Sequence, residues 1–143
     1  MKYPGSLRVN RVFLAIATTL IGGAMGMGID HLAFAQQPGI TRTILLRTDD
    51  PASSAYEAVV GVAEIPPGAS SGKHQHHGTE VGYVLQGTLV IEHAGSAAVT
   101  VAAGQAFKNE GGVHNARNPG KTATKILAVY IVEKGKPLAE PVP

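Results

Sequence analysis

The sequence predicts an all-β protein with a single domain. Short runs of β-branched and apolar residues recur at regular intervals, and glycine, proline, asparagine and serine separate them. After residue 35, no segment of a dozen residues shows the 3.6-residue periodicity of an amphipathic helix. Short strands at such intervals, each followed by a turn, are typical of a β-sandwich or a β-barrel.

Nine segments are expected to form strands, because each combines β-branched or apolar residues with turn residues at its end. They span residues 41–48, 56–65, 73–77, 80–86, 88–93, 97–102, 106–109, 113–117 and 123–133. Gly87 lies between two of them and is expected to adopt a positive φ in a tight hairpin. The chain after residue 35 is therefore expected to divide into three parts. These are a lead-in with the first strand (36–55), a β-barrel (56–134) and an extended, proline-containing tail (135–143).

The first 35 residues have the features of a secretory signal peptide. Lys2, Arg8 and Arg11 precede an apolar run at 12–29, and Ala-Phe-Ala at 33–35 provides a cleavage site of small residues. We expect this segment to be removed, so that the protein is periplasmic or extracellular and meets the membrane only in transit. The alternative is an uncleaved membrane anchor, because the apolar run approaches the length that spans a bilayer.

The charges and the lack of cysteine limit the possible partners. Residues 1–35 hold three of the 12 basic residues and one of the 10 acidic residues, which leaves nine of each in the mature chain. About 108 residues without net charge form one small domain. They contain no basic stripe for phosphate, so no nucleic-acid partner is expected. Without cysteine, disulfides and a lipid-modified N-terminal cysteine are excluded.

Two of the expected strands are apolar on both faces. Residues 81–85 and 126–132 lack the alternation of apolar and polar residues that a strand with one solvated face shows. Their outer faces are therefore expected to be covered, either by another strand of the chain or by a second subunit. Of these two, we favour a homodimer.

Residues 68–87 contain the side chains best suited to bind a metal ion. His74 and His76 are two positions apart, so in an extended segment they leave the same face, roughly 7 Å apart at about 3.3 Å per residue. Glu80 keeps the same parity and can return to that face after a turn at 78–79. Side chains arranged in this way can converge on one transition-metal ion. The alternative is a polar strand that faces solvent.

The pattern G-x5-H-x-H-x3-E-x6-G over residues 68–87 resembles the first motif of the cupin superfamily, and every fixed position is present. Residues 104–118 are similar to the second motif, in which His114 and Asn118 keep the H-x3-N spacing. The segment before His114 is one residue shorter than the usual pattern and lacks its proline. The resemblance extends from about residue 41 to residue 137.

This resemblance implies a jelly-roll barrel of six to eight strands, with one cupin domain per chain. It also implies one divalent transition metal inside the barrel, held by four ligands: His74, His76, Glu80 and His114. Three imidazole nitrogens and one carboxylate suit Fe, Mn, Co, Ni, Cu or Zn. Four protein ligands on an octahedral ion leave two adjacent positions for water, substrate or dioxygen, so we expect an open site.

Three functions are compatible with such a site. The first is an oxygenase-type enzyme that acts on a small organic molecule, in which Glu80 both binds the metal and can accept a proton. The second is a non-catalytic module that holds a metal and a small ligand. The third is a sugar-type isomerase, which needs a histidine–tyrosine acid/base pair in place of a full metal set. The resemblance to cupins, more than the residues themselves, favours the first over the second by a small margin.

Export would influence which metal is bound. Arg8 and Arg11 do not form a twin-arginine pair, so the chain is expected to cross the membrane unfolded and to acquire its metal outside. The general affinity order of divalent metals then favours copper or zinc over iron and manganese, unless the geometry opposes it.

Two further histidines are not expected to bind the ion. His77 has the opposite parity to His76 and should point away, in a loop or against a ligand. His93 precedes the turn at 94–96 and should lie exposed at the end of a hairpin.

Overall fold

The computed structural model describes residues 39–143, which belong to one compact unit. These residues form ten strands and no helix: β1 (Thr41–Asp50), β2 (Ser53–Ile65), β3 (His74–Gln75), β4 (Gly78–Gln86), β5 (Thr88–His93), β6 (Val99–Ala102), β7 (Ala106–Glu110), β8 (His114–Arg117), β9 (Thr124–Glu133) and β10 (Glu140–Pro141). The expected signal peptide and the first three residues of the lead-in lie outside the described residues.

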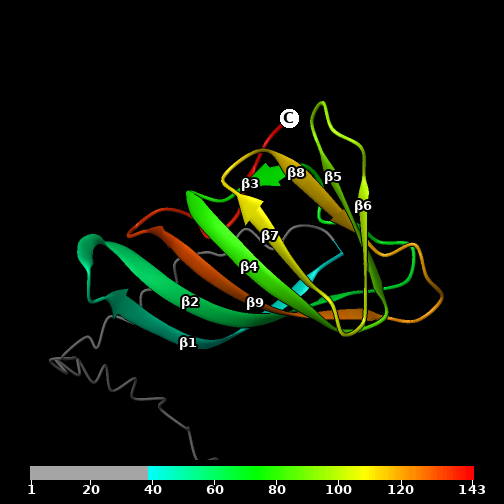
Figure 1. Cartoon of the computed structure of the whole chain (residues 1–143), viewed down its shortest axis with the longest axis horizontal. Coiled ribbons are helices and arrows are strands. Elements are labelled where there is room, and N and C mark those ends of the chain that lie inside the picture. The colour runs from blue at the N-terminus through cyan, green and yellow to red at the C-terminus, as the bar shows by residue number, and fades with distance from the viewer. Residues whose placement is uncertain (1–38) are drawn as a thin grey trace, which may run out of the picture. The chain divides into compact units, whose positions relative to one another are not determined.

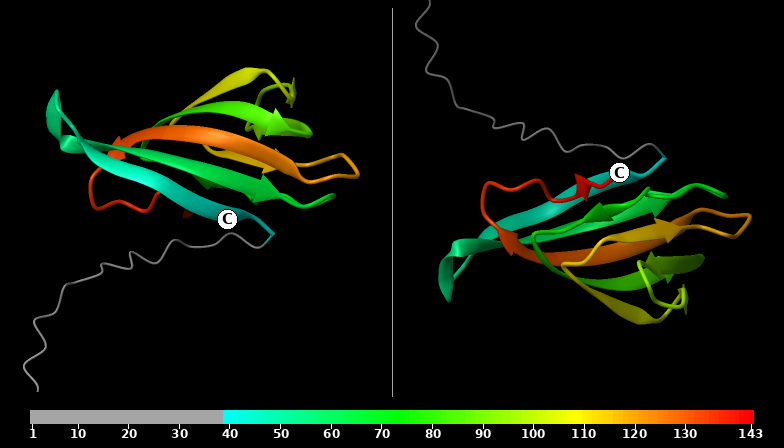
Figure 2. Two further views of the ribbon diagram at one scale, coloured as in Figure 1. Left: turned by 90° about the horizontal axis from the view of Figure 1, so that it is seen from below. Right: turned by 90° about the horizontal axis from the view of Figure 1, so that it is seen from above.

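The strands form two antiparallel sheets of five strands each (Figure 1). The first sheet has the order β1-β2-β9-β4-β7, and the second has the order β10-β3-β8-β5-β6. In both views of Figure 2 the long strands β2 and β9 run side by side, and they pair from Tyr56 with Glu133 to Ile65 with Thr124. Strands that are far apart in the sequence, such as β4 and β9, are neighbours in the sheet, as in a jelly roll. The all-β prediction is confirmed for the described residues.

Alternating burial explains why the long strands form one wall of the barrel. In β2 every second residue from Glu57 to Ile65 is buried, including Val59 and Ala63, and the residues between them are partly exposed. In β9 the same alternation buries Ile126 and Val132. The inward side chains of this sheet pack against Leu89 and Ile91 of β5 and Val101 of β6, which belong to the other sheet.

No strand in the described part of the chain covers the outer face of β4. Val81, Tyr83 and Leu85 alternate with buried neighbours and are 47%, 44% and 49% exposed. Ile131 on the adjacent strand β9 is also 39% exposed. Coverage by another strand of the same chain is therefore not observed, and coverage by a second subunit stays a prediction.

Two glycines position the strand that carries Glu80. Gly78 begins β4 with φ of 152°, and a Cβ atom there would lie 2.0 Å from the backbone oxygen of Ile131 on β9. Gly87 follows β4 with φ of 80°, as the hairpin prediction requires. Both ends of β4 therefore depend on the absence of a side chain.

The C-terminal tail turns and bends between residues 134 and 139, and it then contributes a strand that the sequence did not indicate. Glu140 and Pro141 form β10, which pairs antiparallel with β3. The Val142 amide donates a hydrogen bond to the Lys73 carbonyl at 3.0 Å. Leu138, just before β10, is 5% exposed and packs in the core. The tail is thus attached to the strand that carries the first proposed ligand.

Within residues 39–143 there is no helix of the length and hydropathy that crossing a membrane requires. The apolar run at 12–29, on which the prediction of a signal peptide or membrane anchor rests, lies outside this range.

Candidate metal centre

The register of the second sheet places three histidines in one row. His74 on β3 is the direct cross-strand partner of His114 on β8, and His114 is in turn the partner of His93 on β5. His74 and His114 point inward and are each 2% exposed. Cross-strand partners lie within direct contact distance, so a sheet can bring together residues that are far apart in the chain.

A second row faces the first from the opposite sheet. Glu80 on β4 is the cross-strand partner of Tyr130 on β9 and of Asn109 on β7. All three side chains are buried, with exposures of 5%, 3% and 2%. The site therefore lies between two rows of polar side chains, one from each sheet, inside an otherwise apolar barrel.

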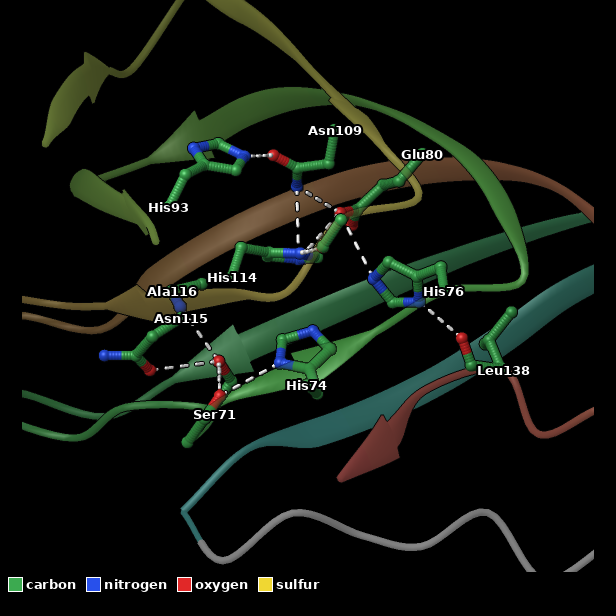
Figure 3. Close-up of polar contacts among 12 residues, drawn as sticks. Ser71, His74, His76, Glu80, His93, Asn109, His114, Asn115, Ala116 and Leu138 are labelled. Atoms are coloured by element: carbon green, nitrogen blue, oxygen red, sulfur yellow. Dashed lines mark hydrogen bonds and ion pairs between the residues drawn. The ribbon is translucent and has the colours of Figure 1, made fainter. Parts of the chain in front are cut away.

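His76 lies between β3 and β4 and completes the cluster (Figure 3). Its ring centroid is 4.9 Å from that of His74 and 5.1 Å from that of His114, and His74 and His114 are 4.3 Å apart. One nitrogen from each ring lies within 4.8 Å of the other two. The predicted convergence of the three imidazoles is thus present in the structure, and the solvent-facing alternative for His74 and His76 does not hold, since both are buried.

Each of the three histidines donates its Nδ1 hydrogen to a backbone carbonyl. His74 Nδ1 bonds to Gly72 at 3.0 Å, and His114 Nδ1 bonds to Gly112 at 2.9 Å. His76 Nδ1 bonds to the carbonyl of Leu138. These bonds fix the tautomer, so the lone pair of each ring is on Nε2.

The Nε2 atom of His76 shows that a metal ion fits this arrangement. It is buried and has no hydrogen-bond partner among residues 39–143. The Glu80 Oε2 atom lies 3.4 Å away, which is an ion-pair distance without hydrogen-bond alignment. A buried polar atom without a partner is unfavourable, and coordination to a metal would satisfy its lone pair.

Glu80 lies next to two of the three histidines. Its Oε2 atom is 3.8 Å from His114 Nε2, besides the contact with His76. The same oxygen accepts a hydrogen bond of 2.6 Å from the Asn109 amide (Figure 3). Glu80 is therefore placed to act as a fourth ligand.

The protonation states of His74, His114 and Glu80 are those that metal binding requires. Burial lowers the pKa of His74 to about 3, and burial also lowers the pKa of His114, so both rings are neutral near pH 7. Burial by itself would raise the pKa of the Glu80 carboxyl. The neighbouring His76 ring and the Asn109 amide outweigh that effect and hold the Glu80 pKa below its ordinary value. Neutral imidazoles and an ionised carboxylate are the forms that coordinate a cation.

His93 ends β5 just before the turn at 94–96, as predicted, but its predicted exposure is wrong. His93 is partly buried, its ring lies 5.7 Å from that of His114, and its Nε2 donates to Asn109 Oδ1 at 3.1 Å. It thus reaches the metal centre through Asn109. His77 does point away from the cluster, as predicted, and its Nε2 lies 2.8 Å from Glu140 Oε2 in the tail.

The sequence did not indicate three other residues around the cluster. Asn109, Tyr130 and Arg42 line a small cavity beside His74, Glu80 and His114, and its volume is about 20 Å³. A second pocket of about 190 Å³ is also lined by His114, together with residues that include His93 and Lys73. Asn109 and Tyr130 can be recognised only as the cross-strand partners of Glu80. That pairing is known only once β4 has been placed between β7 and β9.

Comparison with known proteins agrees with this geometry. The family model of the cupin domain matches residues 61–130, a segment that contains all of the proposed ligands. The chain belongs to the cupin superfamily. This cupin is 36% identical over 70 residues to an oxalate-binding protein of Thermotoga maritima, a match that covers 48% of this chain. The chain spans only 58% of the length of that relative.

Solved structures of other proteins have folds similar to that of this cupin. A cupin domain of Bordetella pertussis is 26% identical, with a TM-score of 0.52 over 66% of this chain and 95% of that chain. A double-stranded β-helix protein of Klebsiella pneumoniae has a TM-score of 0.60 at 20% identity, over 73% of this chain and 87% of that chain. At 20% identity, the second likeness bears on the fold alone.

Proposed function

We propose that this cupin is a metal-dependent oxidoreductase of the oxygenase type that acts on a small organic molecule. The observation that supports it most directly is the buried cluster in which three Nε2 atoms converge while each Nδ1 is held by the main chain. Glu80 would complete the ligand set. A site with four protein ligands leaves room in an octahedral coordination sphere for a substrate, as an enzyme needs and a structural metal site does not.

The metal and the residues around it would make different contributions to the reaction. The bound metal would supply Lewis acidity and, if it is redox-active, electron transfer. Glu80 is ionised at neutral pH but is a weak base, because its pKa is lowered. It would accept a proton from a substrate hydroxyl or thiol only once the metal has made that group more acidic. The Asn109 amide holds the carboxylate in place, and apolar side chains such as Ile65 and Leu89 line the cavity and exclude water.

We also propose that the protein is exported after removal of residues 1–35. The support is the order of basic start, apolar run and small-residue site in the sequence. Mass spectrometry of the protein from periplasmic and secreted fractions of its native host should give a chain that begins at Gln36. An intact N-terminus in the membrane fraction would contradict export and support the membrane-anchored alternative.

The metal acquired by an exported chain should follow availability and intrinsic affinity. Copper or zinc is then expected in protein purified from the exported fraction, as measured by inductively coupled plasma mass spectrometry. Iron or manganese as the sole metal would contradict this assignment. That result would not affect the assignment of the four proposed metal ligands.

The second candidate is a binding module that holds a small ligand on the metal without converting it. The name of the Thermotoga relative, an oxalate-binding protein, favours this function, although the match covers only part of that protein. The isomerase alternative has less support. Tyr130 does lie 5.0 Å from His76 between ring centroids, but burial raises the pKa of its hydroxyl, which makes Tyr130 a poor acid.

Oxygen consumption separates the two candidates. Protein loaded with Fe²⁺, Cu²⁺ or Mn²⁺ should consume oxygen with at least one compound in a panel of catechols, flavonols, thiols and small organic acids. His76→Ala should abolish both metal retention and turnover, whereas Glu64→Gln, which alters an exposed ion pair with Lys125, should change neither. Full metal loading without any oxygen uptake, combined with a retained ligand, would contradict the enzyme and support the binding module.

A further inference from the structure

The cavity at the metal centre has no room for an organic substrate. Its volume of about 20 Å³ accommodates roughly one water-sized group, and the proposed ion would fill it. Most of the side chains around it are buried, among them Ile65, Leu89 and Tyr130. A substrate that reaches the ion therefore has to displace part of this wall.

One side chain of the wall is suited to move. Among the described residues that line the cavity, those that are partly exposed are Arg42, Ala116 and Phe107. Arg42 interacts with the Tyr130 hydroxyl, and Ala116 has only a methyl group. Phe107 is left as the large apolar side chain that both lines the cavity and is accessible to solvent.

The ring of Phe107 closes the cavity because it lies over a glycine. Phe107 on β7 is the direct cross-strand partner of Gly82 on β4. A Cβ atom at Gly82 would lie 2.2 Å from Cζ at the tip of the ring, so the ring occupies the space that a side chain would need. Gly82 follows Glu80 by two residues and is buried on the same face, roughly 7 Å along the strand at about 3.3 Å per residue.

The position of β7 leaves this ring a way out of the cavity. β7 has five residues and pairs with β4, and no strand in the described part of the chain pairs with its other side (Figure 1). A change of the Phe107 χ1 rotamer can carry the ring from Gly82 toward this open edge. Such a rotation breaks no main-chain hydrogen bond of the sheet.

We propose that Phe107 is the gate through which a substrate reaches the metal centre. This inference rests on the proposed metal centre and adds its access route and the size of its ligand. When the ring turns outward, it vacates a flat, apolar space beside the proposed ligands. That space suits a planar ring of similar size that carries an oxygen donor, as in a phenol.

The rate at which catechol binds to Co²⁺-loaded protein tests the gate. Stopped-flow absorption of the cobalt, under anaerobic conditions at pH 7, measures the association rate. Phe107→Ala should bind catechol about tenfold faster or more, because binding no longer waits for the ring to move, and should take up Co²⁺ like the wild type. The control Val101→Ala, which truncates a residue of the same core cluster away from the cavity, should match the wild type.

Fluorine NMR follows the ring itself in the wild-type protein. The chain has three phenylalanines, at positions 13, 34 and 107, and 4-fluorophenylalanine labels all of them. The Phe107 signal is the one that is missing from Phe107→Leu. On saturation with catechol this signal should shift and show a larger difference between H₂O and D₂O, as expected for a ring that has moved into solvent.

The outcomes separate the gate from the proposed function. Equal association rates in wild type and Phe107→Ala, a fluorine signal that does not change, or a wild type that binds no catechol would each overturn the gate and leave the metal centre standing. A protein that takes up no Co²⁺ would overturn both. If Phe107→Ala does not fold, Phe107→Leu and the fluorine signal of the wild type still decide the question. Cobalt content after gel filtration shows that catechol has not extracted the ion.

Discussion

Asn109 connects the two rows of side chains that form the metal centre. Its amide nitrogen donates to Glu80 Oε2 at 2.6 Å and lies 3.3 Å from His114 Nε2. Its carbonyl oxygen accepts from His93 at 3.1 Å, so the orientation of the amide is fixed from the opposite sheet. One amide therefore orients the carboxylate of Glu80 and contacts the imidazole of His114, two of the proposed ligands.

Asn109→Ala should weaken metal binding without removing any proposed ligand. The Glu80 carboxylate would lose its hydrogen-bond donor, and loss of such an orienting partner typically lowers metal affinity about 10- to 100-fold. Zinc titrations by calorimetry at pH 7 measure the change. His93→Ala should give a smaller loss, because it leaves the Asn109 amide present but less well oriented. The matched control is Asn115→Ala, whose amide bonds to Glu92. Equal zinc affinity in Asn109→Ala and wild type would contradict the role.

The sequence predicted the proposed ligands because their spacing carries the information. His74, His76 and Glu80 lie within seven residues, and parity alone places them on one face. Asn109 and Arg42 could not be found in that way, because they reach the site through pairing with distant strands. The exposure of His93 was predicted wrongly for the same reason: its position before a turn is local, whereas its contact with Asn109 is not.

At the scale of elements, β10 connects the C-terminus to the metal centre. It pairs with β3, which carries His74, and the preceding carbonyl of Leu138 accepts the hydrogen bond from His76. In the same segment, the carboxylate of Glu140 accepts from Gln75 at 2.9 Å and contacts His77 at 2.8 Å. These contacts hold both ends of the short segment that bears the first two ligands.

Deletion of residues 138–143 should lower zinc affinity by about tenfold or more while the barrel remains folded. The deletion removes the carbonyl that fixes the His76 tautomer, a loss of the kind that typically costs 10- to 100-fold in metal affinity. Calorimetry gives the affinity, and circular dichroism reports the fold. Deletion of residues 142–143 serves as the control, because it leaves Leu138 and β10 in place. Full zinc affinity after the longer deletion would show that the tail does not position His76.

The nine strands foreseen from the sequence all appear, whereas β10 does not follow from its residues. Each of the nine carries an apolar, β-branched or turn signal of its own, and the alternation within β2 and β9 matches their burial. The β10 segment has two residues, one of them proline. Nothing in its local sequence indicates a partner, and it becomes a strand only because β3 offers an unpaired edge.

The whole molecule should become less stable in acid when no metal is bound. His74 and His114 are neutral in the folded protein because burial lowers their pKa values, whereas in the unfolded chain they take up a proton near pH 6.5. Stability is therefore fully present above pH 6.5 and declines as the pH falls toward about 3. The lowered pKa of Glu80 adds a further loss below its ordinary value of 4.5.

Thermal unfolding between pH 3 and pH 8, with EDTA or with excess Zn²⁺, measures this dependence. The melting temperature of the EDTA-treated protein should fall as the pH decreases below 6.5. Zinc should raise the melting temperature at pH 7 and have little effect near pH 4, because protons compete for the imidazoles. A melting temperature independent of pH between 4 and 7 would contradict the neutral state of the histidines.

The apolar outer face of β4 predicts that the molecule is a homodimer. Val81, Tyr83 and Leu85 are each more than 40% exposed on one face of the first sheet. Light scattering at micromolar concentration should give twice the mass of the chain, and Leu85→Lys should give the monomer, since burying an unpaired charge is unfavourable. Val99→Lys is the control, since Val99 is 51% exposed but lies on β6 of the other sheet. A monomeric wild type would contradict the prediction.

The tautomers of the three histidines proposed as ligands are set by carbonyl groups of Gly72, Gly112 and Leu138. Two of these residues have no side chain, and the third contributes only its main chain to the bond. Amino-acid exchanges around the cluster can therefore alter its polarity, its volume or the ligand it accepts without changing which nitrogen faces inward. New chemistries could arise on this barrel by neighbouring substitutions alone, so long as the path of the chain is preserved.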